Sequence, residues 1–123
     1  MDLLQLLPVD SVAVKLKHPV TGDELDATIN IYGKDSSVFK NAIKQRAKAQ
    51  IARKSKELDL DANDKDNIDV LADCTKSWSG IAEGSKEITF SRDAAIELYT
   101  KYVWIREQID IAIGDRANFF MNA

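Results

Sequence analysis

The sequence predicts a small α+β fold in which an N-terminal β-hairpin packs on about four α-helices, with helix predominating. Two observations lead to this prediction. Residues 11–32 contain two stretches of alternating apolar and polar side chains, the pattern of strands with one buried face. Residues 36–120 carry apolar side chains at helical spacing, with turn signals between the segments. A length of 123 residues suits one domain, so we expect a single domain over residues 1–123.

The hairpin is expected over residues 11–32. Val12, Val14 and Leu16 alternate with less apolar residues in its first strand. The apolar residues of its second strand are Leu25, Ala27, Ile29 and Ile31. Between the two strands, the segment HPVTGDE contains a proline and a glycine, which favour a reversal of the chain.

The middle of the chain is divided by charge. Residues 34–56 hold eight basic side chains against one acidic side chain, and residues 57–73 hold seven acidic side chains against one basic one. Candidate caps at residues 35–37 precede apolar residues at helical spacing, which predicts a basic helix over residues 36–56. The segment that follows begins the acidic block and is expected to form an acidic loop over residues 57–67.

The lysines of the basic helix allow three interpretations. They can form a solvated helix face, pair with an acidic surface such as residues 57–73 of a second copy, or follow the phosphates of a nucleic acid. No aromatic side chain follows Phe39 in this helix and no base-reading module is recognisable, so a nucleic-acid partner is the least favoured. The candidate protein-binding residues of this helix are Lys40, Lys44 and Lys48.

A helical half is expected over residues 68–120. Its first helix is predicted from Ile68 to Trp78, because apolar residues recur there at helical spacing. These residues are Val70, Leu71, Cys74 and Trp78. Ser91 is expected to cap the next helix, which should break near Tyr102.

The last helix, expected from about Val103 to Phe120, has more apolar side chains than one core-facing stripe needs. Ten of its eighteen positions are apolar. One face is expected to hold Ile105, Ile109, Ala112 and Ile113. A helix of this kind lies at the centre of a fold or is covered by a partner. Its candidate protein-binding residues are Trp104, Ile111, Phe119 and Phe120, and we expect Trp78 rather than Trp104 to be a core residue.

No enzyme chemistry is visible, and we expect no catalytic, cofactor-binding or metal-binding residues. The run that begins at Asp59 resembles a calcium loop, but its sixth position is Asp64 instead of glycine and its twelfth is Val70 instead of glutamate. His18 and Cys74 are the single histidine and cysteine, too few for a zinc site by themselves. Cys74 is expected to be a core thiol.

The composition also predicts where the protein works. The opening segment MDLLQLLPVD carries an acid where a secretory signal carries a base, so we expect no signal peptide. An uncharged apolar stretch of about 18 residues is missing, so no membrane-spanning helix is expected. One cysteine excludes an internal disulfide and fits a reducing cytoplasm.

The second half of the chain resembles a known family. The residues that carry the resemblance are Trp78 and Gly80, the short extended Ile88–Phe90, the cap Ser91, the segment VWIREQI at 103–109, and Asn118-Phe119. A tryptophan–glycine step, a capped helix and a helix with this glutamine pattern that ends near Asn-Phe are together similar to the tail assembly chaperones of long-tailed bacteriophages, of siphophage or prophage type. The resemblance covers roughly residues 11–120, hairpin included.

The resemblance implies a non-catalytic morphogenesis factor of the host cytoplasm. Such chaperones coat the tail tape measure protein, keep its long helices soluble and recruit the major tail protein. They tend to form rings or spirals, so a homo-oligomer is expected, and this chain would be the shorter, non-frameshifted product. Two alternatives stay open: a structural tail-completion or head–tail connector protein, and a small nucleic-acid-binding regulator that uses the basic helix.

Overall fold

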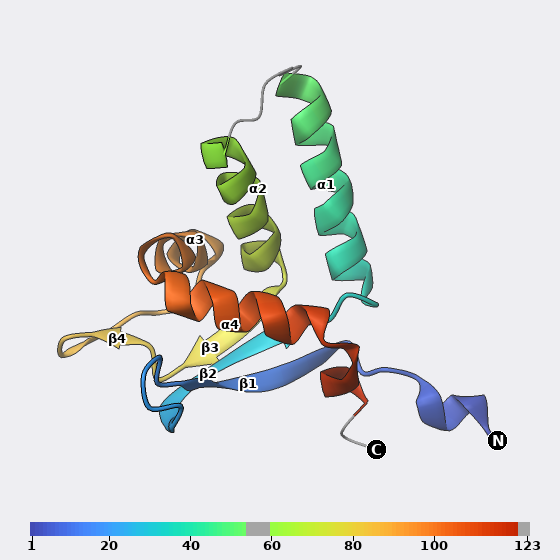
Figure 1. Cartoon of the computed structure of the whole chain (residues 1–123), viewed down its shortest axis with the longest axis horizontal. Coiled ribbons are helices and arrows are strands. Elements are labelled where there is room, and N and C mark those ends of the chain that lie inside the picture. The colour runs from blue at the N-terminus through green and yellow to red at the C-terminus, as the bar shows by residue number, and fades with distance from the viewer. Residues whose placement is uncertain (54–59, 121–123) are drawn as a thin grey trace.

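The computed structural model describes residues 1–53 and 60–120 and confirms the α+β class. A three-stranded antiparallel sheet of order β1-β2-β3 forms the base, and the four α-helices of the described residues lie on one side of it (Figure 1). The elements in chain order are η1 (Leu3–Leu6), β1 (Ser11–Lys17), β2 (Glu24–Tyr32), α1 (Ser37–Arg53), α2 (Leu60–Asp73), β3 (Thr75–Ser79), β4 (Ala82–Glu83), β5 (Lys86–Glu87), α3 (Arg92–Lys101), α4 (Val103–Gly114) and η2 (Arg116–Phe119).

β1 and β2 form the predicted hairpin. Ser11 lies opposite Tyr32 and Val14 lies opposite Ile29 in the antiparallel register. Gly22 supplies the positive φ of 76° that the reversal requires and that other residues rarely adopt. The side chains that the two strands bury beneath the helices are Leu16, Ala27, Ile29 and Ile31.

The third strand corrects the helix predicted from Ile68 to Trp78. α2 ends at Asp73, and the chain then enters β3, where Trp78 lies opposite Ile29 of β2. The last turns of α2 and the strand both face the same core. Apolar residues therefore continue at a spacing typical of one helix, although the backbone has already changed its conformation.

The predicted acidic loop is also corrected, because residues 60–67 form the first turns of α2. Acidic side chains at the N-terminal end of a helix are favoured by the helix dipole. Burial of Ile68 and Leu71 further along α2 fixes the helix against the rest of the fold. The basic helix, α1, spans Ser37–Arg53, and residues 54–59 of the two predicted segments lie outside the described residues.

The C-terminal helices follow the prediction at their start and depart from it at their end. Ser91 caps α3 by accepting a hydrogen bond of 3.0 Å from a first-turn N–H. Tyr102 alone separates α3 from α4, at the predicted break. α4 ends at Gly114 and not at Phe120, because Asp115 adopts an extended backbone and a separate 3₁₀ turn, η2, follows.

α4 crosses the sheet and supplies the centre of the core (Figure 1). Its predicted inward face is confirmed: the buried residues are Ile105, Ile109, Ala112 and Ile113. Gln108 also ties this helix to β1. The Gln108 side-chain amide donates to the Lys17 carbonyl at 2.8 Å, and its oxygen accepts from the Lys17 N–H at 2.9 Å.

Two buried titratable groups lie between α2, β3 and α3. Cys74 is a fully buried thiol, as predicted, and Tyr99 is fully buried beside it. The Tyr99 hydroxyl is 2.7 Å from the Thr75 hydroxyl, which in turn donates to the Leu71 carbonyl. Burial raises the pKa of the Cys74 thiol to about 12 and that of the Tyr99 hydroxyl to about 12.

Candidate protein-binding surface

Most of the apolar side chains expected on the last helix lie in the core or against it. Phe119 was a candidate for protein binding, which requires an exposed side chain, but it is 2% exposed and belongs to the core. The chain leaves α4 at Gly114, and η2 turns the Phe119 ring back onto the sheet. Trp104 and Phe120 are half-buried, with Trp104 packed against the core. Ile111 is the member of this candidate set that is well exposed, at 72%.

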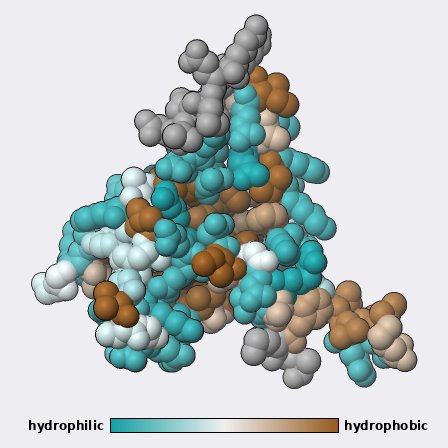
Figure 2. Space-filling model, in the orientation of Figure 1, coloured by the Kyte–Doolittle hydropathy of each residue, from teal (hydrophilic) through white to brown (hydrophobic). Residues whose placement is uncertain are grey.

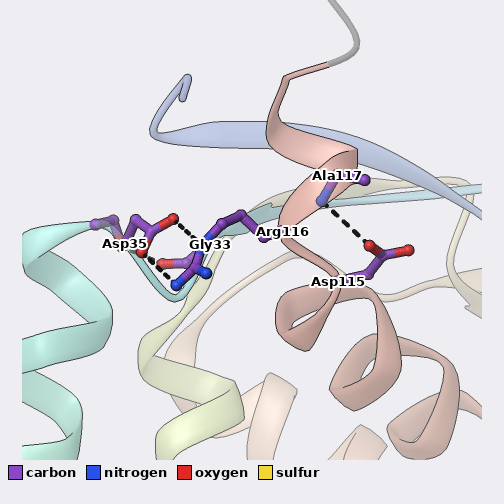
Figure 3. Close-up of polar contacts among 6 residues, drawn as sticks. Gly33, Asp35, Asp115, Arg116 and Ala117 are labelled. Carbon is purple, nitrogen blue, oxygen red and sulfur yellow. Dashed lines mark hydrogen bonds and ion pairs between the residues drawn. The ribbon is translucent and has the colours of Figure 1, made fainter. Parts of the chain in front are cut away.

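An ion pair fixes the segment that carries Phe119 (Figure 3). Arg116 donates from Nε and Nη2 to the two carboxylate oxygens of Asp35, at 2.7 and 3.0 Å. Figure 3 also shows the Asp115 carboxylate accepting from the Ala117 N–H, at 3.1 Å. The hydrogen bond from Arg116 holds the pKa of Asp35 below its ordinary value. η2 is thereby tied to the loop that precedes α1.

The three candidate lysines of α1 all face solvent. Lys40, Lys44 and Lys48 are exposed, and their spacing of four residues places them along one side of the helix. Within the described part of the chain none of them forms an ion pair. α1 and α2 stand away from the sheet as a helical hairpin (Figure 1), and Ile51 near its tip is 75% exposed.

Most of the exposed large apolar side chains of the described residues lie in residues 1–9, which we call the N-terminal arm. Among the described residues, six of the ten large apolar side chains that are exposed belong to it. They are Met1, Leu3, Leu4, Leu6, Leu7 and Val9. The arm leaves the body beside η2 and forms a brown projection in Figure 2 (compare Figure 1). The sequence contained its apolar run before Pro8, but nothing in the sequence showed that the body leaves it uncovered.

Among the residues that the structure describes, the backbone hydrogen bonds between the arm and the body lie at the root of the arm. The Val9 N–H donates to the Phe119 carbonyl at 2.9 Å, and the Asp10 carbonyl accepts from the Gly33 N–H at 3.1 Å. Further out, the Asp2 carboxylate caps η1. No residue of η1 is buried. The arm therefore begins at a fixed point and presents its leucines to solvent.

A groove lies at the opposite end of α4, where α2, α3 and α4 meet. Its apolar lining comes from Ile68, Ile96 and Val103, one from each helix. Lys65 and Arg106 contribute to its rim. The groove has a volume of about 480 Å³, within the roughly 300–1,000 Å³ typical of sites that enclose a ligand. The surface thus offers an apolar projection and an apolar recess.

No protein-family model, curated protein or solved structure matches this chain. Among residues 1–53 and 60–120, no three histidine, cysteine, aspartate or glutamate side chains gather closely enough to hold a metal ion. No helix in the same residues has the length and apolar character needed to cross a bilayer. The described surface therefore offers exposed apolar side chains for contact with a partner and, on other parts of the molecule, exposed charged side chains.

Proposed function

We propose that this chain is a non-catalytic assembly factor that binds other proteins and self-associates, in the manner of a phage tail assembly chaperone. The N-terminal arm is the observation that carries the proposal. Scattered exposed apolar side chains are normal on a soluble protein, whereas a contiguous apolar segment marks a contact with another protein or a membrane. Residues 1–9 contain no lysine or arginine, whereas the polar face of a membrane-binding helix is rich in them, which favours a protein partner.

The clients in this proposal are those of the tail assembly chaperones that residues 11–120 resemble. They are the tail tape measure protein and the major tail protein, met in the host cytoplasm. A long amphipathic helix aggregates unless its apolar stripe is covered, and apolar anchors set in a groove or on a projection can cover it. The exposed leucines of the arm and Ile111 on α4 are the anchors that this chain provides.

Charge supports the same role. The stripe of Lys40, Lys44 and Lys48 is exposed on a helical hairpin that projects from the body. Exposed charge of one sign keeps a protein soluble and steers it toward oppositely charged surfaces. A protein with exposed apolar anchors needs such charge to remain dispersed before its partner arrives.

Co-expression with a tape measure protein tests this function. The wild-type chain should move a client that is insoluble alone into the soluble fraction, and the two proteins should then co-purify. A Leu4→Gln/Leu7→Gln variant should lose most of this effect, because the arm loses its apolar contacts. Val20→Gln is the matched control, since Val20 is 86% exposed in the hairpin turn and should be silent. A wild-type chain that leaves the client insoluble would contradict the proposal.

A further inference from the structure

We propose that the N-terminal arm of one copy docks in the groove between α2, α3 and α4 of a second copy, so that copies join head to tail. This inference rests on the proposed function in one respect, that the arm contacts a protein. It adds a second partner for the arm, which is another copy of the chain, and the site on that copy where the arm lies.

The positions of arm and groove dictate a head-to-tail contact. The groove includes Val103 and Arg106 from the first turn of α4, whereas the root of the arm is bonded to Phe119, beyond the other end of that helix. A helix of 12 residues is about 18 Å long, and Figure 1 places the arm and the start of α4 on opposite sides of the body. Two different patches that meet form a heterologous interface, which closes into a ring or continues as a helical array.

The groove suits apolar anchors. Among its lining residues, Ile68 is buried, Ile96 is half-buried, and Val103, the first residue of α4, is 44% exposed. A volume of about 480 Å³ accommodates several aliphatic side chains of the arm. Burying these side chains would remove apolar area from water on both copies, which is the main driving force of association.

The charges of arm and groove are complementary. The arm and its root carry Asp2 and Asp10 and no basic side chain. On the rim of the groove stand Lys65 and Arg106, with Asp64 as the single acid. Neither Lys65 nor Arg106 forms an ion pair with any residue that the structure describes. Docking the arm on this rim would bring the Asp2 carboxylate to these two bases.

A neighbouring groove fits the arm less well. It has a volume of about 380 Å³ and lies on the other side of α3, where Glu83 and Glu97 contribute to its lining. The Lys101 ammonium in that groove already contacts the Glu83 carboxylate at 2.5 Å. The one charged side chain of the arm is the acid Asp2, which would meet the Glu97 carboxylate there, so the groove lined by Lys65 and Arg106 is the favoured site.

Complementation between two full-length variants tests the contact. The arm variant Leu4→Gln/Leu7→Gln keeps its groove, and the groove variant Val103→Glu/Arg106→Glu keeps its arm. Sedimentation velocity at low ionic strength should show assemblies for the wild-type chain and monomers for each variant alone. An equimolar mixture of the two should contain one-to-one dimers, because the intact arm of one variant meets the intact groove of the other. Far-UV circular dichroism and the melting temperature verify that both variants are folded.

Control and charge-swap variants complete the test. Val20→Gln changes an exposed residue outside both surfaces and should assemble like the wild-type chain. Arg106→Glu alone should weaken assembly at least tenfold at low salt, and adding Asp2→Lys in the same chain should restore much of it, because the pair is then reversed. This restoration distinguishes a direct contact from a general effect of charge.

Three results would overturn the inference. They are a wild-type chain that stays monomeric at high concentration and low salt, an arm variant that assembles normally, and a mixture of folded variants that stays monomeric while the arm variant alone has lost assembly. In the last case the arm binds a different protein, such as a helical client. Failure of the proposed function looks different: the wild-type chain and the variant mixture assemble as described, but no client becomes soluble.

Discussion

The ring of Phe119 lies so close to the backbone of Gly33 that a methyl group added at Gly33 would be 2.8 Å from two of the ring carbons. This contact joins the C-terminal 3₁₀ turn to the end of the hairpin, because Gly33 follows β2 and Phe119 ends η2. The same two residues hold the root of the arm through their backbone hydrogen bonds to Asp10 and Val9. A side chain at position 33 would therefore disturb both the core and the start of the arm.

Gly33→Ala should lower the free energy of unfolding by about 1–3 kcal/mol, the usual cost of overpacking a closed site. Gly114→Ala is the matched control, because a methyl group there meets no atom within 4 Å. Gly114 is the last residue of α4, so alanine should leave stability unchanged or raise it by up to about 1 kcal/mol. Urea denaturation of both variants measures the difference. Equal effects would mean that the Phe119 ring moves aside without cost.

Stability should decrease in alkaline solution. Burial raises the pKa of Cys74 from 9.0 to about 12 and that of Tyr99 from 10.0 to about 12, so the unfolded chain releases these protons at lower pH than the folded chain. The unfolded state then binds fewer protons, and the free energy of unfolding falls as pH rises. It should be nearly constant to pH 9 as far as these two groups are concerned, and decrease between about pH 9 and 12.

A cysteine variant separates the two contributions. In Cys74→Ala, the decrease should begin nearer pH 10, since Tyr99 is then the remaining group of the pair. Urea titrations at successive pH values give the comparison directly. An unchanged onset in the variant would show that the Cys74 thiol does not contribute to the alkaline transition.

Both tryptophans should matter for stability, contrary to the expectation that Trp78 alone is a core residue. Each is half-buried and packed against the core. Trp78 also donates from its indole to the Ile88 carbonyl at 2.8 Å and meets Phe90 edge to face at a centroid distance of 5.0 Å. Replacing either tryptophan by alanine should cost toward the lower end of the roughly 3–5 kcal/mol typical of a buried tryptophan. Chemical denaturation would show whether one of them is instead dispensable.

Ile111 should matter for the client and not for the fold. It is 72% exposed on α4, so Ile111→Gln should change the free energy of unfolding by less than about 0.5 kcal/mol. In co-expression with a tape measure protein, the same change should reduce the amount of soluble client. If solubility of the client is unaffected, the client lies on the arm or on the α1–α2 hairpin.

The lysine stripe provides a test of the nucleic-acid alternative. Charge reversal in Lys40→Glu/Lys44→Glu/Lys48→Glu should leave far-UV circular dichroism unchanged, because all three side chains are exposed. We expect the wild-type chain to show no salt-dependent binding of duplex DNA at low ionic strength. Binding that decreases with salt and is lost in the triple variant would support a nucleic-acid-binding regulator.

Local signals predicted several elements correctly because they depend on few residues. Strict alternation in β1 and β2 predicted the hairpin, since period two is set by the strand itself. Ser91 predicted the start of α3 through the hydrogen bond that a serine hydroxyl supplies to a first-turn N–H. The inward face of α4 followed from helical spacing alone.

Other elements depend on tertiary contacts that no local pattern contains. β3 forms because its residues pair with β2, and a register shift between Asn30 and Ile31 removes the alternation that would have identified it. The first turns of α2 are rich in aspartate and asparagine, which have low helix propensity, but packing of Ile68 in the core compensates for it.

The binding surface was predicted less well than the fold. Phe119 and Leu4 are both apolar, but the structure buries Phe119 and exposes Leu4. Exposure of an apolar residue depends on which neighbours the folded chain can bring to it. For Phe119 that neighbour is Gly33, distant in sequence, whereas η1 has no buried residue at all.

The hydrogen bonds between Gln108 and Lys17 have a consequence for the sheet itself. β1 lies at the edge of the sheet, and a free edge strand is a template on which a strand of another molecule can add. At Lys17 both backbone groups are already bonded to the Gln108 amide, which takes the place of a neighbouring strand. An incoming strand finds neither a donor nor an acceptor at this position. The glutamine therefore protects this part of the edge against the addition of a strand from another molecule, which is the first step of amyloid-like growth.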